Sequence, residues 1–167
     1  MLKLLMLAAV LLTAFAIVAA VLKAKMAGGV KAGVYCLKKT LFTPAERSFL
    51  GVLDSLLPEG IRVFGKVRLE DFLGVKSGLE KGERQGARNR INRKHIDFLL
   101  VRSADLSPVA GIELDDRSHD AEDRQERDAF VDEAFKSAGL PLLHIPAAKS
   151  YNPAELRSKL TGILPTA

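Results

Sequence analysis

The sequence predicts an α/β domain in which a mixed sheet is flanked by helices, preceded by one N-terminal transmembrane helix. Two observations support this fold class. An uncharged apolar run occupies residues 4–22. After it, segments with the periodicities of helices and strands follow in the order α-β-β-β-α-β-α, separated by glycine and proline residues. The chain's 167 residues leave room for one domain and an appendage.

The apolar run has the length of a membrane span. Residues 4–22 contain one polar residue, Thr13, and as a helix they extend about 28 Å, close to the thickness of the bilayer's hydrocarbon core. A cleaved signal peptide is the alternative, but its apolar core usually runs about 7–15 residues. Five lysines follow the run and one precedes it, which favours a cytoplasmic C-terminal domain. We therefore predict a single-pass anchor of the inner membrane at residues 1–22.

The net charge of +5 is unevenly distributed along the chain. Residues 1–39 carry six lysines and no acid, so the remainder has 19 basic and 20 acidic residues and is not a polycation. Residues 23–41 are predicted to form a basic juxtamembrane linker that contacts anionic lipid, and residues 42–167 the domain. The only cysteine, Cys36, excludes an intrachain disulfide and agrees with a reducing compartment.

The domain opens with signals for a helix and a strand. Thr43 as N-cap, Pro44 in the first turn and Glu46 form a capping box. Residues 61–69 alternate in part and are predicted as a strand. The polar, glycine-containing residues 74–94 are predicted as loop.

A hairpin and a helix–strand–helix unit follow. Residues 95–101 and 109–114 are predicted as antiparallel strands joined by a turn. A helical pattern covers 119–138, residues 140–145 form a short buried strand, and a last helix occupies 153–160.

Carboxylates gather on the two hairpin strands. Glu113 and Asp115 are two residues apart and leave the same face of their strand. Asp97 interrupts the apolar run of the preceding strand, where an unpaired carboxylate is costly. Across the hairpin these three oxygen ligands suit Mg²⁺ or Mn²⁺. The alternative is a strand-to-helix loop in which Asp115 and Asp116 favour the positive end of the next helix.

Five segments of the chain, LFTPAERSFL, HIDFLLV, IELDDRSHD, ERDAF and AGLPLLHIP, resemble the uncharacterised bacterial family known as domain of unknown function 2726. The resemblance covers roughly residues 40–162. Asp97, followed sixteen residues later by Glu113-x-Asp115, also resembles the PD-(D/E)XK nuclease superfamily. That resemblance implies a restriction-endonuclease-like αβββαβ core and metal-dependent hydrolysis of phosphodiesters.

The resemblance also implies roles for individual residues. Asp97 and Glu113 match the metal-binding acids, and Glu46 matches an additional glutamate of many such nucleases. Asp115 stands where the superfamily has a lysine that positions or activates the attacking water. The implied metal ligands are Asp97, Glu113 and Asp115.

A histidine is the expected replacement for the missing lysine. The chain resembles, more distantly, the very short patch repair endonucleases, which lack that lysine and use a histidine after the acidic strand. His119 is the matching candidate and His95 is another. The predicted catalytic set is therefore Asp97, Glu113, Asp115, His119 and Glu46, acting with Mg²⁺ or Mn²⁺.

A basic segment lies beside this acidic one. Residues 62–94 hold ten basic and four acidic residues, a net of +6, whereas residues 95–139 hold five and twelve, a net of −7. We predict that nucleic-acid phosphates bind to Arg84, Arg88, Arg90, Arg93, Lys94, Gln125 and Arg127. A solvated face is the alternative. Residues 73–97 contain no aromatic residue, so base stacking is not expected there.

These observations predict a membrane-anchored, cytoplasmic nuclease-like domain that hydrolyses nucleic acid with Mg²⁺. Two other functions stay open. One is a catalytically inactive nucleic-acid-binding module that keeps the fold, and the other is an interaction module whose acidic patch contacts a protein partner.

Overall fold

The computed structural model describes residues 1–26, 34–115 and 122–164. It divides the chain into two compact units, Met1–Leu41 and Phe42–Ala167. The first unit contains the helix α1 (Leu2–Met26). Within the described part of the chain, no helix combines the length and the apolar character that crossing a membrane requires.

That finding corrects the predicted transmembrane anchor, and with it the predicted single-pass location in the inner membrane. The prediction counted residues 4–22 as one apolar span.

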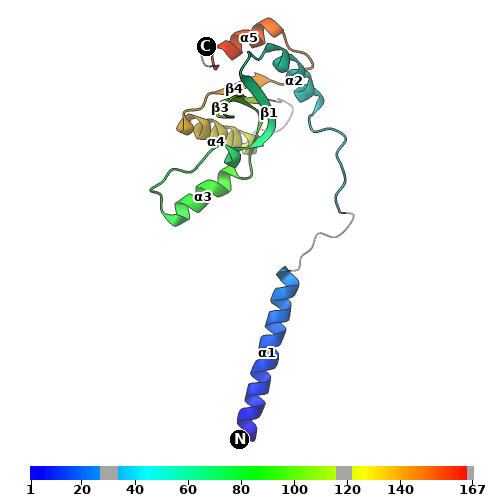
Figure 1. Ribbon diagram of the computed structural model, residues 1–167, viewed down its shortest axis with the longest axis vertical. Helices are drawn as coiled ribbons and strands as arrows, with labels where there is room; N and C mark the ends of the chain where they lie inside the picture. Colours follow the sequence, from blue (N-terminus) through cyan, green and yellow to red (C-terminus); the bar gives the residue numbers. More distant parts are fainter. Residues whose placement is uncertain (27–33, 116–121, 165–167) are drawn as a thin grey trace. The chain divides into compact units, whose positions relative to one another are not determined.

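The second unit is a mixed α/β domain with a four-stranded sheet (Figure 1). Its strands lie in the order β1-β2-β3-β4, with β1, β2 and β3 antiparallel and β4 parallel to β3. The mixed sheet and its helices agree with the prediction from sequence. The elements are α2 (Pro44–Leu56), β1 (Ile61–Arg68), the 3-10 helix η1 (Leu69–Asp71), α3 (Lys81–Ile91), β2 (His95–Arg102), β3 (Pro108–Asp115), α4 (Glu122–Ala138), β4 (Leu142–Pro146) and α5 (Pro153–Thr161).

Apolar side chains cover both faces of the sheet. On one face α2 and α5 pack against β2 and β3, with Phe49, Phe98 and Ile112 among the buried residues. On the other face α4 packs against the sheet, with Leu99 and Phe135 among the buried residues. Figure 1 shows α2 and α5 together and α4 apart from them. Burial on both faces explains why β2 reads as a nearly continuous apolar run.

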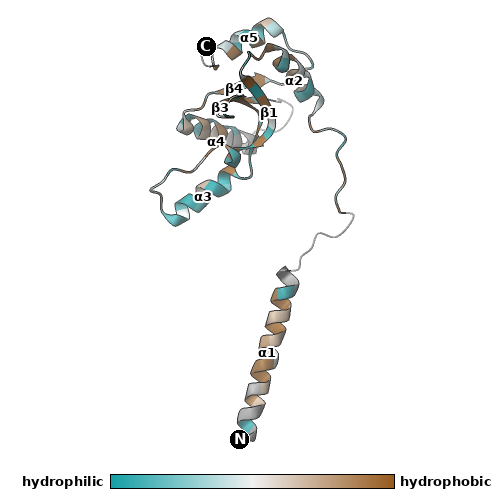
Figure 2. Cartoon of the chain, in the orientation of Figure 1, coloured by the Kyte–Doolittle hydropathy of each residue, from teal (hydrophilic) through white to brown (hydrophobic). Residues whose placement is uncertain are grey.

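The helix α3 lies where the sequence predicted loop. It has few apolar residues, and Figure 2 shows it mostly hydrophilic. The sequence therefore shows no apolar stripe at helical spacing from which this helix could be predicted. Its start carries a capping box in which Glu80 and Glu83 each accept a backbone N–H. Ile91, at its end, is buried in the core beside α4. The cap and this one anchor therefore accompany a helix whose other residues are mostly exposed.

Candidate functional site

Asp97 of β2 lies opposite Glu113 of β3. The strands pair Phe98 with Ile112, which makes the two acidic residues neighbours across the hairpin. The backbone N–H of Leu114 donates to Asp97 Oδ2 at 3.0 Å, and a side-chain hydrogen bond joins Asp97 and Glu113. Glu113 is only 8% exposed. The fold therefore brings two of the three predicted metal-binding acids together.

A lysine that the sequence analysis did not select completes this group. Lys66 of β1 donates from Nζ to Asp97 Oδ1 at 2.7 Å and to Glu46 Oε1 at 2.5 Å. Its φ angle is 56°, in the left-handed region that non-glycine residues rarely adopt. Such a conformation costs on the order of 1 kcal/mol and is typically retained at functional sites. The strained residue of β1 is thus the one that contacts both carboxylates.

Glu46 has two roles in the structure. Its Oε2 accepts the backbone N–H of Thr43 at 2.8 Å, and Thr43 caps α2 in return, as the capping box predicted. Its Oε1 accepts from Lys66. The capping interaction therefore also orients a carboxylate toward the centre of the site.

The charges of Lys66 and Asp97 stabilise each other. Burial disfavours the charged form of Lys66, but hydrogen bonds to Asp97 and Glu46 outweigh it and raise the pKa of Lys66 above 10.5. Burial likewise disfavours ionised Asp97, while hydrogen bonds from Lys66, from the Leu114 amide and with Glu113 hold its pKa below 3.8. At neutral pH the pair is therefore an ammonium and a carboxylate.

Asp115 belongs to a different group. His144 of β4 has its Nδ1 3.0 Å from Asp115 Oδ1 and its Nε2 2.8 Å from Asp132 Oδ1 of α4. Burial lowers the pKa of His144, but the hydrogen bonds to both carboxylates outweigh it, so the pKa lies above 6.5. Both nitrogens donate only in the imidazolium form. His119, the first histidine predicted to replace the missing lysine, lies outside the described residues.

Replacing His144 with glutamine is expected to weaken the domain at acidic pH and to change little at alkaline pH. A raised pKa means that the imidazolium's contribution is complete below pH 6.5 and is lost as pH rises through the folded-state value. Because the imidazole is partly exposed, we expect a loss of up to about 1 kcal/mol in the free energy of unfolding. Urea denaturation at about pH 5.5 and about pH 9 measures it, with His95→Gln as the control. Equal losses at both pH values would contradict the assignment.

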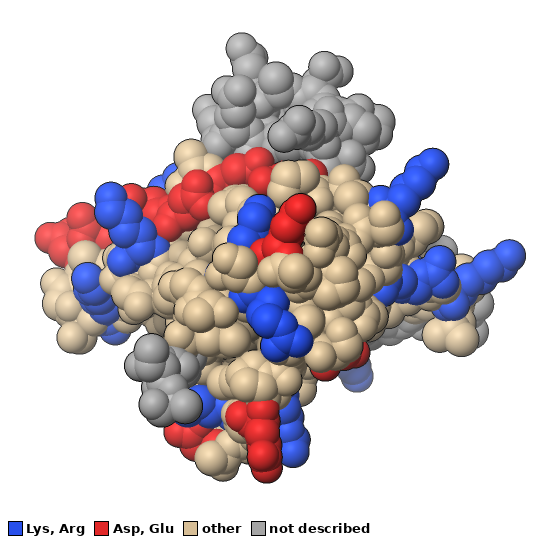
Figure 3. All heavy atoms as spheres, turned by 90° about the horizontal axis from the view of Figure 1, so that it is seen from above, with Lys and Arg blue, Asp and Glu red and all other residues tan. Residues whose placement is uncertain are grey.

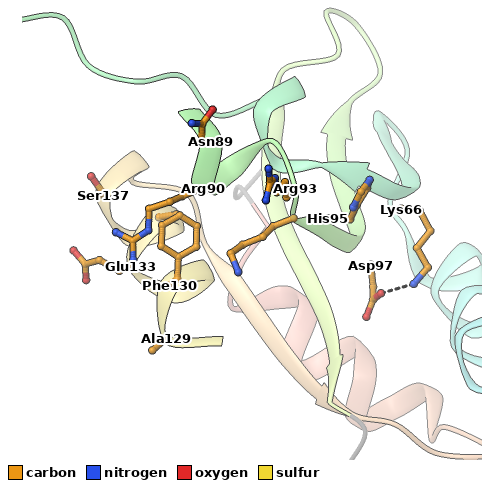
Figure 4. A pocket seen from close by; sticks show the side chains of 12 residues that line it. Lys66, Asn89, Arg90, Arg93, His95, Asp97, Ala129, Phe130, Glu133 and Ser137 are labelled. Carbon is orange, nitrogen blue, oxygen red and sulfur yellow. Dashed lines mark hydrogen bonds and ion pairs between the residues drawn. The ribbon is translucent and has the colours of Figure 1, made fainter. Parts of the chain in front are cut away.

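A cleft of about 1170 Å³ adjoins Lys66 and Asp97 (Figure 4). Three of the predicted phosphate-binding residues, Arg90, Arg93 and Lys94, line it. His95 lies between them and Asp97. The structure thus brings three residues of the basic run and Asp97 to one cleft.

The other predicted phosphate-binding residues lie elsewhere. Arg84 and Arg88 line a second, smaller cleft of about 400 Å³, and Arg88 donates to Glu70 at 2.8 and 3.0 Å. Gln125 and Arg127 have side chains outside the part that the structure describes. The face in Figure 3 carries separate groups of acidic and basic side chains, with no continuous basic surface on it.

Three residues of interest were missed from the sequence. Lys66 lies an even number of residues from Arg62 and Arg68, which are exposed. The strand period of two therefore indicated that Lys66 is a surface residue. Phe130 fits the apolar pattern of a core-facing helix position, and only the fold brings it to the cleft. His144 was detectable, because a histidine within an apolar strand signals a polar partner.

A family model described as "Protein of unknown function (DUF2726)" matches residues 38–163. The chain belongs to this family. The match spans all strands of the sheet and the helices α2 to α5, and so includes Lys66, Asp97 and Glu113. No curated protein and no solved structure matches the chain. The family's description assigns no activity, so the likeness to nucleases stays a prediction.

Proposed function

We propose that residues 42–167 form a metal-dependent hydrolase of nucleic-acid phosphodiesters. The observation that carries this proposal is the group of Lys66, Asp97 and Glu113 beside a cleft lined by cations. An acidic pair and a lysine are the groups that hydrolysis of a phosphodiester needs: ligands for a cation and a fixed positive charge. The basic residues of the cleft supply attraction for phosphates.

The two carboxylates fit Mg²⁺ or Mn²⁺. These cations often take one or two protein carboxylates and complete their coordination with water and substrate phosphate. Among the described residues no group of three or more His, Cys, Asp or Glu side chains is placed to hold a metal. Asp97 and Glu113 would therefore be the ligands, without Asp115. When bound, the cation would polarise the phosphoryl oxygen and lower the pKa of a coordinated water.

The side chains around the pair have separate roles in this proposal. Lys66 keeps its proton at neutral pH, because its pKa is raised, so it acts as a fixed cation and not as the base. It holds Asp97 in place and faces the developing negative charge on the phosphate. Proton transfer is assigned to a histidine, and His95 lines the same cleft. Arg90, Arg93 and Lys94 bind the neighbouring phosphates.

One observation favours a second function, a binding module without catalysis. The ammonium of Lys66 already contacts two carboxylates, an arrangement that also suits a structural ion-pair network. In that case the cleft still binds nucleic acid through its cations. The two functions differ in whether a metal is bound and in whether the strand is cut.

A thermal-shift measurement tests the metal site. We expect Mn²⁺ or Mg²⁺ to raise the melting temperature of the wild-type chain, because a ligand that binds the native state stabilises it. Asp97→Asn should lose this metal-dependent rise in melting temperature. Its melting temperature should still respond to salt at least as much as that of the wild type. The matched control is Asp105→Asn, which changes an exposed carboxylate of the turn after β2 and should keep the increment. An equal metal response in wild type and Asp97→Asn would exclude this site.

A further inference from the structure

Phe130 of α4 lies under two cations in the cleft. The guanidinium carbon of Arg90 is 4.7 Å from the ring centroid, and Lys94 Nζ is 5.2 Å from it. Arg90 belongs to α3 and Lys94 directly precedes β2, so their contacts with Phe130 of α4 join parts of the chain that are far apart in sequence. Phe130 lines the same cleft as Lys66 and Asp97, and Figure 4 shows its ring beside the Arg90 side chain.

Among the described residues, the cations around this ring have no carboxylate as an ion-pair partner, although Glu133 lines the same cleft. Within the part of the chain that the structure describes, Arg90, Arg93 and Lys94 form no ion pair. Arg88, two residues before Arg90, does form an ion pair with Glu70, so another arginine of α3 has a carboxylate partner. Two like charges near one ring repel each other. An anion placed between them would remove that repulsion, and a phosphate is the anion that the proposed function supplies.

A ring with an adjacent guanidinium is also a platform for bases. Unpaired bases stack on aromatic side chains and on Arg guanidinium planes, and this stacking tolerates any sequence. A paired base inside a duplex has no free face to offer. A cleft that combines Phe130 and Arg90 with unpaired cations therefore suits a strand whose bases are free, more than it suits a duplex.

We propose that Phe130 and Arg90 form a base-stacking subsite, and that the cleft accepts single-stranded nucleic acid with its phosphates on Arg93 and Lys94. The proposal rests on the proposed function and specifies its substrate class. One base lies on Phe130 while the strand continues along the cleft toward Lys66 and Asp97. The sequence offered no aromatic residue for base stacking within residues 73–97, and the structure supplies the ring from α4 instead.

Fluorescence anisotropy in EDTA tests the subsite without cleavage. The probes are labelled oligothymidylate, oligouridylate, an abasic deoxyribose oligomer of the same length, and a blunt DNA duplex. We expect Phe130→Leu to weaken binding of the base-containing strands by about 5- to 150-fold. Binding of the abasic oligomer should not change, which also shows that the variant is folded. Phe130→Tyr keeps a ring and should keep most of the affinity, and Arg84→Ala, at the second cleft, should have little effect.

The outcomes separate this inference from the proposed function. If Phe130→Leu leaves all affinities unchanged, or lowers abasic and base-containing strands equally, the subsite is wrong while hydrolysis can still stand. Tighter binding of the duplex than of the single strands overturns it as well. Binding that depends on Phe130 but is followed by no cleavage in Mn²⁺ supports the subsite and overturns the hydrolase. Comparison of oligothymidylate with oligouridylate shows whether DNA or RNA is the source of the strand.

Discussion

Replacing Lys66 with methionine is expected to lower the free energy of unfolding by about 2 kcal/mol in EDTA at neutral pH. The change removes the ammonium from Asp97 and Glu46, whose side chains are only 16% and 11% exposed. Breaking a fully buried pair costs about 3–5 kcal/mol. Because 32% of the Lys66 side chain is exposed, solvent screening reduces that cost. Urea denaturation of wild type and variant measures the difference.

The loss should depend on pH and on metal. Asp97 has a lowered pKa, so its contribution is present above 3.8 and is lost as pH falls through the folded-state value. Wild type and Lys66→Met should therefore become equally stable in acid. Mn²⁺ should restore part of the loss at neutral pH, because it brings positive charge to the same carboxylate. Lys66→Arg keeps the charge and is the matched control. If Lys66→Met is as stable as wild type at neutral pH, the ion pairs of Lys66 do not contribute to the free energy of unfolding.

The sheet was largely predictable from local patterns. The apolar runs at 95–101 and 109–114, separated by a short turn, indicated a hairpin, and β2 and β3 form one. The alternation of side chains then placed Asp97 and Glu113 near each other. The helix cap at Thr43 also agrees with the structure. Each of these signals comes from residues close together in the chain.

The rest of the site depends on contacts that no local pattern contains. Lys66 reaches Asp97 only because β1 pairs with β2, and its role rests on an unusual backbone angle. Phe130 meets Arg90 only because the fold brings α3 and α4 together at the cleft. The helix α3 itself was missed, because its stability does not come from an apolar stripe. The parts of the site that could not be predicted from the sequence are therefore those that form by contacts between segments far apart in the chain.

Asp115 has a partner that neither the motif nor the spacing indicated. The resemblance placed it at the position of a lysine, and spacing placed it on the face of Glu113. In the structure its carboxylate accepts from His144, a residue of β4 that lies beside β3 in parallel register. Lys66, on another strand, places an ammonium beside Asp97.

The rate at which a labelled single strand is cut in Mn²⁺ tests the central claim most directly. The claim is that Asp97 and Glu113, with Lys66, form a metal-dependent hydrolytic site. Wild type should cut the strand, and EDTA should stop it. Asp97→Asn should lower the rate at least about a hundredfold, because the cation's contribution of several kcal/mol to the transition state is lost. Asp105→Asn, purified in the same way, should cut at the wild-type rate. The claim is contradicted if wild type does not cut in Mn²⁺ or Mg²⁺, or if Asp97→Asn cuts as fast as wild type.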